Sequence, residues 1–257
     1  TRLSMTVSIP CLMFMALVRS EIDPAVLRDT VIAAFVVYIA VGLAVWVMAL
    51  LTRLDVATYW APMTFGNTGN IGLPIALFAF GQPGFDFAVV IFAVMAILSF
   101  TFGVWVVAGG GSPVTAIREP LFWGAALGGL FLGFGWTVPV WVANSLDLVG
   151  QMAIPLMLIT LGVAISRLHP QALGRALWLS LLKLVLCAGT AYGIGILFEL
   201  PHPALAVLVL QVATPVAVTS YMLAAKYHAR ADEVAGLVVV STLLSVAAIP
   251  LILALFV

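Results

Sequence analysis

Charged residues are scarce in this 257-residue chain, at 8% of the sequence, whereas 64% of the residues are hydrophobic. Soluble domains carry about 25% charged residues, so this composition excludes an ordinary soluble domain and indicates a protein that crosses a membrane several times. Acidic and basic residues balance, and the formal net charge is zero. We therefore expect no nucleic-acid partner, because such partners require a basic surface.

Cysteine and histidine are also few, and several reactive motifs are missing. Cys11 and Cys187 both lie in apolar segments, and no histidines have metal-ligand spacing, so we expect no disulfide, no metal ion and no cofactor. The chain has no Gly-x-x-x-x-Gly-Lys loop, which excludes ATP as its own energy source. It also lacks His-Glu-x-x-His and Gly-x-Ser-x-Gly, so an intramembrane enzyme is disfavoured.

Long hydrophobic runs fill the chain instead, and their lengths predict an all-α polytopic membrane protein. We expect nine spans, each near the roughly 20 residues that a bilayer requires. The spans are residues 3–18, 25–51, 56–80, 84–107, 120–135, 139–165, 171–198, 203–227 and 233–256. The connections are short, and the longest, residues 108–119, is expected to be a cytoplasmic join between two halves.

The two halves resemble each other at an offset of 145 or 146 residues. The correspondences are Pro10 with Pro155, Pro24 with Pro170, and Asp86 with Asp232. Residues 1–107 then hold four spans and residues 120–257 hold five, so we expect one more helix before Thr1. Because five is odd, the second unit would enter the membrane upside down, as in the inverted repeats of secondary transporters.

Two of the spans contain residues that interrupt a helix. The third span holds Gly66-Asn67-Thr68-Gly69-Asn70-Ile71-Gly72-Leu73-Pro74, in which Gly66, Gly72 and Pro74 are expected to break the helix. Pro215 is expected to break the eighth span. One break alone would fit a kinked packing helix equally well. Two breaks favour a binding site, because in lipid a broken helix persists only where protein encloses it.

An inverted repeat would make the two broken helices cross near the middle of the membrane. Two half-helix N-termini would then meet, and their partial positive charges attract an anion such as a carboxylate. The carbonyl ends of the other two half-helices could hold a cation, but no acidic cluster accompanies them. The expected substrate-binding residues are Asn67, Thr68, Gly69, Asn70, Gln211, Thr214, Pro215, Thr219 and Ser220.

Four residues outside the breaks are candidates for coupling or for the facing wall of the cavity. Lys183 lies near the centre of the seventh span, where an ionisable side chain is costly and suggests a function, although snorkelling or a backbone carbonyl would also accommodate it. Asp147 is either a proton site or a group wetted at the interface. Gln151 and Pro155 belong to the same sixth span, and Gln151 is expected to face the cavity.

The segment Gly66-Asn67-Thr68, followed by Ile71-Gly72-Leu73-Pro74, resembles the fourth-helix crossover of the auxin efflux carrier family. This family includes plant PIN-FORMED carriers and bacterial organic-acid permeases. Pro215 and the segment from Ala224 to Tyr227, with Asp232 beyond it, resemble the ninth-helix crossover. The resemblance implies that Asn67 binds the substrate carboxylate and that the fold has ten helices in two inverted five-helix repeats.

The resemblance also implies a division of labour between two groups of helices. A scaffold of residues 1–19 and 120–165 would carry homodimer contacts, while a transport domain of residues 25–107 and 171–257 would move like an elevator. The chain departs from plant carriers, which have proline in place of Gly66 and of Ser220 and a long cytoplasmic loop. A carrier of small carboxylates, of the malate or malonate kind, therefore fits better than an auxin carrier.

The resulting hypothesis is a secondary active transporter of a small mono- or dicarboxylate, and not an enzyme. The alternatives are an anion channel, an exporter of auxin-like aromatic carboxylates and a sodium-coupled organic anion symporter. Seven lysine and arginine residues fall on one expected side of the membrane and two, Arg19 and Arg28, on the other. The positive-inside rule makes the richer side cytoplasmic and puts the C-terminus outside, in a multi-pass protein of a bacterial inner membrane surrounded by lipid.

Overall fold

The computed structural model describes residues 3–109, 120–166, 168 and 172–256, and the named elements within these ranges are all helices. This confirms the predicted all-α class. Most of the expected 108–119 join lies outside the described residues, as do Arg2, Arg118 and Pro170. The inverted repeat stays a prediction.

The helices range in length from one turn to about eight turns. In chain order they are η1 (Ser4–Ser8), α1 (Ile9–Val18), α2 (Pro24–Thr52), α3 (Val56–Thr64), η2 (Thr68–Gly72), α4 (Leu73–Leu98), η3 (Ser99–Gly103), α5 (Val104–Val107), α6 (Pro120–Phe134), α7 (Val140–Gln151), α8 (Ala153–Ser166), α9 (Leu173–Leu197), α10 (His202–Val212), α11 (Val218–Lys226) and α12 (Ala231–Leu253). The η elements are π-helical turns that continue into the neighbouring α-helices.

Five helical stretches in the described part of the chain are long and apolar enough to cross a membrane. They are Pro24–Thr52, Thr68–Val107, Val140–Val163, Leu173–Leu197 and Ala231–Leu253. The other expected spans form shorter apolar helices, among them Thr6–Val18, Phe122–Phe134 and His202–Val212. The third and fourth expected spans differ most from expectation, because no loop separates them. The chain only kinks at Gly81, whose φ of 65° and ψ of −158° interrupt α4.

Side-chain caps and prolines explain where several helices begin. The carboxylate of Asp23 accepts hydrogen bonds from the backbone N–H of Ala25 (2.8 Å) and Val26 (3.4 Å) at the start of α2. Pro24 occupies the first position of that helix, where its missing N–H costs nothing. Asp55 caps α3 through the N–H of Thr58 in the same way.

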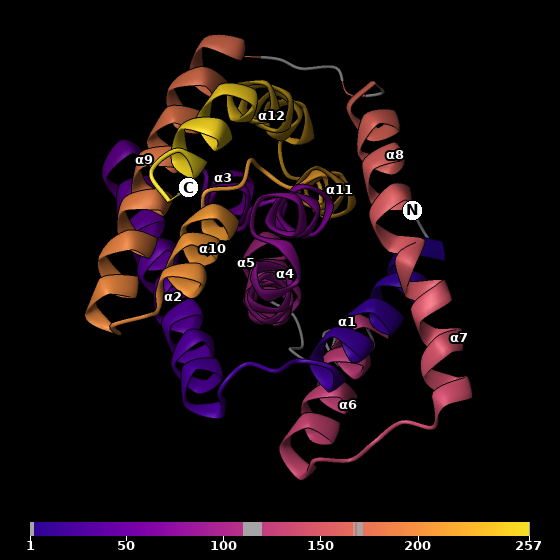
Figure 1. Ribbon diagram of the computed structural model, residues 1–257. Helices are drawn as coiled ribbons and strands as arrows, with labels where there is room; N and C mark the ends of the chain where they lie inside the picture. The colour runs from indigo at the N-terminus through magenta and orange to yellow at the C-terminus, as the bar shows by residue number, and fades with distance from the viewer. Residues whose placement is uncertain (1–2, 110–119, 167, 169–171, 257) are drawn as a thin grey trace.

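The helices fall into two groups with α4 between them (Figure 1). One group contains α1, α6, α7 and α8, and the other contains α2, α3, α9, α10 and α12. Glycines bring α1 and its neighbours close together, since a Cβ on Gly124 would meet the carbonyl oxygen of Pro10 at 2.6 Å and one on Gly150 would meet the Cα of Leu12 at 3.1 Å. Small residues allow the same close approach between helices in lipid.

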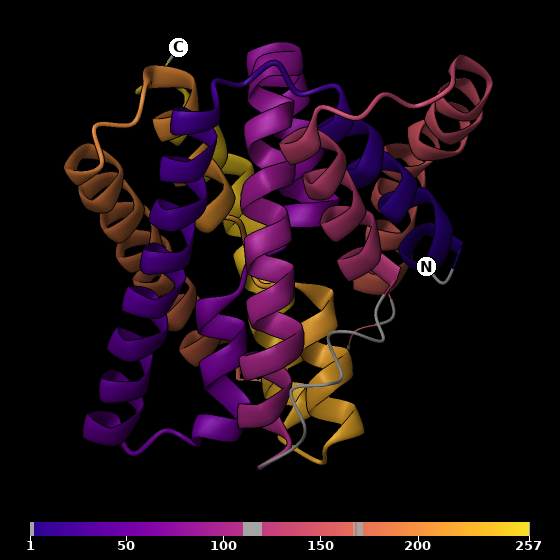
Figure 2. The ribbon, with the colours of Figure 1, turned by 90° about the horizontal axis from the view of Figure 1, so that it is seen from below.

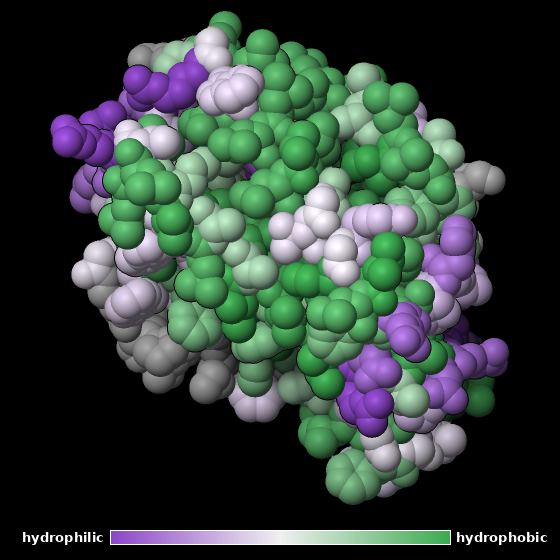
Figure 3. All heavy atoms as spheres, turned by 90° about the vertical axis from the view of Figure 1, so that its left-hand side faces the viewer, coloured by the Kyte–Doolittle hydropathy of each residue, from purple (hydrophilic) through white to green (hydrophobic). Residues whose placement is uncertain are grey.

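The outer surface matches a membrane environment. Seen from a second direction, the long helices α2 and α4 run through the height of the molecule, and they contact one another (Figure 2). The face formed around α2 and α9 shows a broad hydrophobic band, with hydrophilic residues gathered at its two ends (Figure 3). Large apolar side chains such as Leu43, Leu51 and Val185 are exposed on this surface. Such a band is typical of a surface that contacts lipid or another protein.

Candidate functional site

The two broken helices meet at an antiparallel crossing. Gly66 and Val216 form an isolated antiparallel β-bridge, and the backbone N–H of Asn67 donates to the carbonyl of Pro215 at 2.7 Å. Each extended segment therefore satisfies backbone groups that the other leaves free. This is the arrangement that a broken helix requires where no water is present.

Local chemistry explains why α10 stops at the crossing. Pro215 has no N–H to continue the helical ladder, and the Gln211 carbonyl instead accepts from the hydroxyl of Thr214 at 2.6 Å. The next N–H, of Val216, donates to Ser241 Oγ on α12 at 3.0 Å. The extended segment is thus held by the Ser241 side chain of α12 and by the backbone of Asn67.

Two glycines permit the close contact between the broken helices. A Cβ on Gly66 would lie 2.9 Å from the carbonyl oxygen of Thr214 and would also clash with its hydroxyl. A Cβ on Gly72 would lie 2.8 Å from the side-chain Cδ of Gln211. Gly66 is part of the break, but Gly72 and Pro74 lie in the helix that resumes at Thr68, so the break is shorter than the sequence predicted.

A small pocket lies beside the crossing, on the side of the half-helix N-termini. Asn67 is 4% exposed, and its side-chain Nδ2 has no hydrogen-bond partner in the described part of the protein. The pocket has a volume of about 50 Å³, which leaves room for only a few water molecules. Its lining residues are Ile9, Phe65, Gly66, Asn67, Gly69, Asn70, Phe92, Met95, Ala96, Ser99, Phe100, Ala217 and Thr219.

The expected substrate-binding residues divide into two sets. Asn67, Gly69, Asn70 and Thr219 line this pocket. The others are buried in the two broken helices or between their halves and do not line this pocket; they are Thr68, Gln211, Thr214, Pro215 and Ser220. The hydroxyl of Thr68 is fully buried and, like the amide of Asn67, has no partner in the described residues. Only the first set therefore lines a pocket on this side of the crossing.

The opposite side of the crossing contains Lys183. Its side chain is 2% exposed, and its Nζ lies 3.7 Å from Cys187 Sγ one turn along α9. It lines a pocket of about 10 Å³ together with Ser180, Thr214 and Ser245. Within the described residues Lys183 forms no ion pair. Snorkelling does not account for it, because the ammonium group is enclosed.

A larger cavity, which several polar side chains line, lies between α4 and the helices α1, α7 and α8. It has a volume of about 530 Å³, and its lining includes Gln82, Gln151 and Asp147. Asp147 pairs with Arg19 across this cavity. Pro155 lies in the first turn of α8, one turn after the α7 helix ends at Gln151. No sequence signal indicates the Arg19 partner, because the pair joins separate segments of the chain.

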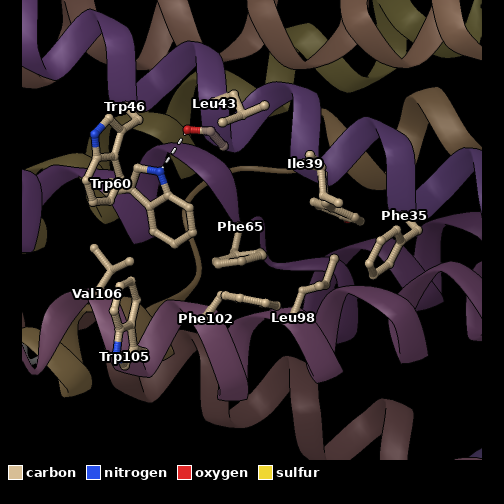
Figure 4. Close-up of a pocket in the computed structure, with 12 residues that line it drawn as sticks. Phe35, Ile39, Leu43, Trp46, Trp60, Phe65, Leu98, Phe102, Trp105 and Val106 are labelled. Atoms are coloured by element: carbon tan, nitrogen blue, oxygen red, sulfur yellow. Dashed lines mark hydrogen bonds between the residues drawn. The ribbon is translucent and has the colours of Figure 1, made fainter. Parts of the chain in front are cut away.

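An aromatic groove opens sideways between α2, α3 and the α4–η3–α5 rod (Figure 4). Its volume is about 340 Å³ and its lining is almost wholly apolar. The indole N–H of Trp60 donates to the Gly42 carbonyl at 2.8 Å, which fixes the ring at one end of the groove. Phe65 lines both this groove and the small pocket, so its ring forms the wall between them.

Comparison with known proteins gives a family and a relative for this chain. A family model described as "Membrane transport protein" matches residues 108–253. The chain belongs to this family, that of the auxin efflux carriers. An "Uncharacterized transporter" of Methanothermobacter thermautotrophicus is 26% identical over 263 residues, which cover 97% of this chain and 86% of the relative. This auxin efflux carrier family member is a membrane transporter. Among its described residues, no group of three or more His, Cys, Asp and Glu side chains could hold a metal ion.

Proposed function

We propose that this protein is a secondary transporter of a small organic anion, a mono- or dicarboxylate, and that the anion binds at the crossing. The observation that carries the proposal is the buried Asn67 amide, which has a free donor and lies beside the N-terminal ends of the η2–α4 rod and of α11. A carboxylate would accept from that donor and would be stabilised by both helix dipoles.

The size of the pocket supports alternating access. A volume of about 50 Å³ does not admit a carboxylate of several carbon atoms. Ile9 of α1 closes the pocket, while the Asn67 crossing belongs to the other helix group. We propose that the group containing the crossing slides against α1, α6, α7 and α8, which enlarges the pocket and exposes it to each side in turn. An elevator of this kind and a homodimer through the α1 group are parts of the same proposal.

The first test is ligand-induced stabilisation of the purified protein. Mono- and dicarboxylates are screened for an increase in the thermal unfolding midpoint, because a ligand that binds only the folded state stabilises it. At least one small carboxylate should raise the midpoint, and the same compound should be taken up into proteoliposomes with saturable kinetics. Uptake that rises linearly with concentration without saturation would favour a channel.

Variants of Asn67 then locate the binding site. Asn67→Ala removes a donor to a charged group, which contributes about 1.5–3 kcal/mol, so affinity for the carboxylate should fall about tenfold to hundredfold. Asn67→Asp places a negative charge against the anion and should weaken binding further. Asn144→Ala is the matched control, because Asn144 is exposed on α7 and away from the pocket. Wild-type binding by Asn67→Asp would refute a carboxylate site at the crossing.

A further inference from the structure

The two sides of the crossing carry opposite partial charges. The pocket beside Asn67 is bordered by segments from which η2 and α11 begin, so it faces helix N-termini. The opposite side is bordered by Ala213, Thr214 and Pro215, which directly follow the last turn of α10. Helix C-termini carry about half an elementary negative charge and leave carbonyl groups without intrahelical donors. The first side suits an anion, and the second side suits a cation.

Lys183 places its positive charge on this second side. Its pocket is shared with Ala213, Thr214 and Pro215 at the end of α10. Through Cys187 it also reaches the end of α3, because Cys187 Sγ donates to the Met63 carbonyl at 3.9 Å. The Lys183 side chain therefore lies near the C-terminal end of α10 and is linked to that of α3 through the Cys187 thiol.

The pocket that Lys183 lines is rich in oxygen atoms of the kind that bind cations. The same pocket is lined by Ser180, Ser241 and Ser245, and hard cations prefer hydroxyl and carbonyl oxygens of this kind. Ser180 Oγ is buried and has no hydrogen-bond partner in the described residues. The volume that remains is about 10 Å³, at the lower limit for one water molecule. Lys183 lines the same pocket, so its side chain takes up part of the space that a cation would otherwise use.

We propose that Lys183 is a built-in cation, which occupies a latent monovalent-cation site at the C-terminal side of the crossing and makes the native protein independent of sodium. The oxygen-lined site becomes available to Na⁺ only when the lysine side chain is removed. This inference goes beyond the proposed transport of an anion, because it concerns the other side of the crossing and is measurable without any substrate.

Two substitutions separate the charge of Lys183 from its volume. Lys183→Ala removes both, so it leaves an empty oxygen-lined site. Lys183→Met removes the charge but keeps an unbranched side chain of similar length in the space. The unfolding midpoint of wild type and of each variant is measured in NaCl and in choline chloride at equal ionic strength. Choline is the control because it is too large for the site.

Sodium should stabilise only one of the three proteins. Lys183→Ala should unfold about 2–4 °C higher in NaCl than in choline chloride, whereas wild type and Lys183→Met should show no difference between the salts. If Lys183→Ala is recovered as a monodisperse protein only when purified in NaCl, that also supports the proposal. Recovery in neither salt, an indifferent Lys183→Ala, or a sodium response in wild type would each overturn it.

A second readout connects the two sides of the crossing. With a carboxylate that stabilises the wild type, Lys183→Met should bind it roughly fivefold or more weakly in both salts, as expected for coupled sites. Lys183→Ala should show the same loss in choline chloride and recover in NaCl. Unchanged carboxylate affinity in both variants would overturn the role of Lys183, and absence of any stabilising carboxylate would count against the proposed function alone.

Discussion

At the scale of single residues, the crossing depends on glycine, whose missing side chain leaves room for a buried neighbour. Gly72 lies in a regular helical conformation, with φ of −66° and ψ of −46°, so its backbone does not require glycine. The reason for glycine there is the Gln211 side chain, which is fully buried and donates from Nε2 to the Ala88 carbonyl at 3.3 Å. A methyl group at position 72 would push that amide away from its partner.

Gly72→Ala should therefore destabilise the protein by about 1–3 kcal/mol, the usual cost of overpacking a buried contact. The penalty should be clearly smaller in a Gln211→Ala background, where the clashing atoms are gone. A double-mutant cycle on thermal unfolding in detergent measures this coupling. Gly189→Ala, at an exposed α9 position with no heavy atom near the added Cβ, is the control and should be neutral or mildly stabilising.

At the scale of helical elements, the sequence predicted the two breaks but not their extent. Pro215 and Gly66 mark the two breaks, because the backbone preferences of proline and glycine are known from the residue type alone. Gly72 and Pro74 looked the same in sequence, yet they lie in the helix after the break. Pro74 follows the π-helical turn η2 directly, and such a local π adjustment is one way in which a helix in a membrane accommodates a proline.

Contacts between distant segments could not be predicted from the sequence in this way. The pairing of Arg19 with Asp147, the contact of the Cys187 thiol with the Met63 carbonyl and the aromatic groove around Trp60 all depend on how helices pack. Composition and span length predict that helices cross the membrane, but they do not specify which faces meet. For the same reason, the sequence could not predict which of the expected substrate-binding residues line the pocket and which lie within the crossing.

The kink in α4 supplies a test at this scale. Gly81 has φ of 65° and ψ of −158°, a region that is essentially restricted to glycine. Gly81→Ala should cost about 1–3 kcal/mol or straighten the rod, although no atom other than Pro83 Cδ lies near the added Cβ. The unfolding midpoint measures the cost, and Gly193→Ala on α9, which has ordinary helical geometry, is the comparison. Equal midpoints for the two variants would show that the kink is not strained.

At the scale of the whole molecule, charges gather at two opposite ends. At one end Glu233 pairs with Arg175 at 3.2 Å and with Arg230 at 3.3 Å, and it accepts from the hydroxyl of Tyr59. These contacts join α3, α9 and α12 into one group. At the other end Arg19 pairs with Asp147 and Arg28 with Asp29. The apolar band lies between these two ends (Figure 3).

The orientation of these ends follows from the positive-inside rule. Cytoplasmic ends of membrane proteins carry an excess of lysine and arginine, so the end with Arg53, Arg175, Lys226 and Arg230 should face the cytoplasm. The α11–α12 connection, which contains Ala229, belongs to that end, and the start of α2, which contains Ala25, belongs to the opposite end.

Cysteine substitution at these two alanines tests the orientation directly. In intact spheroplasts a membrane-impermeant maleimide should label Ala25→Cys but not Ala229→Cys, and it should label both after the membrane is permeabilised. Wild type is the background control, because Cys187 is fully buried and Cys11 is partly buried among helices. The reverse pattern would invert the protein in the membrane, so that the cluster of Arg175 with Glu233 would face the external medium. Labelling of both variants in intact spheroplasts would instead show that the two ends lie on one side, which would contradict the spans on which the whole arrangement depends.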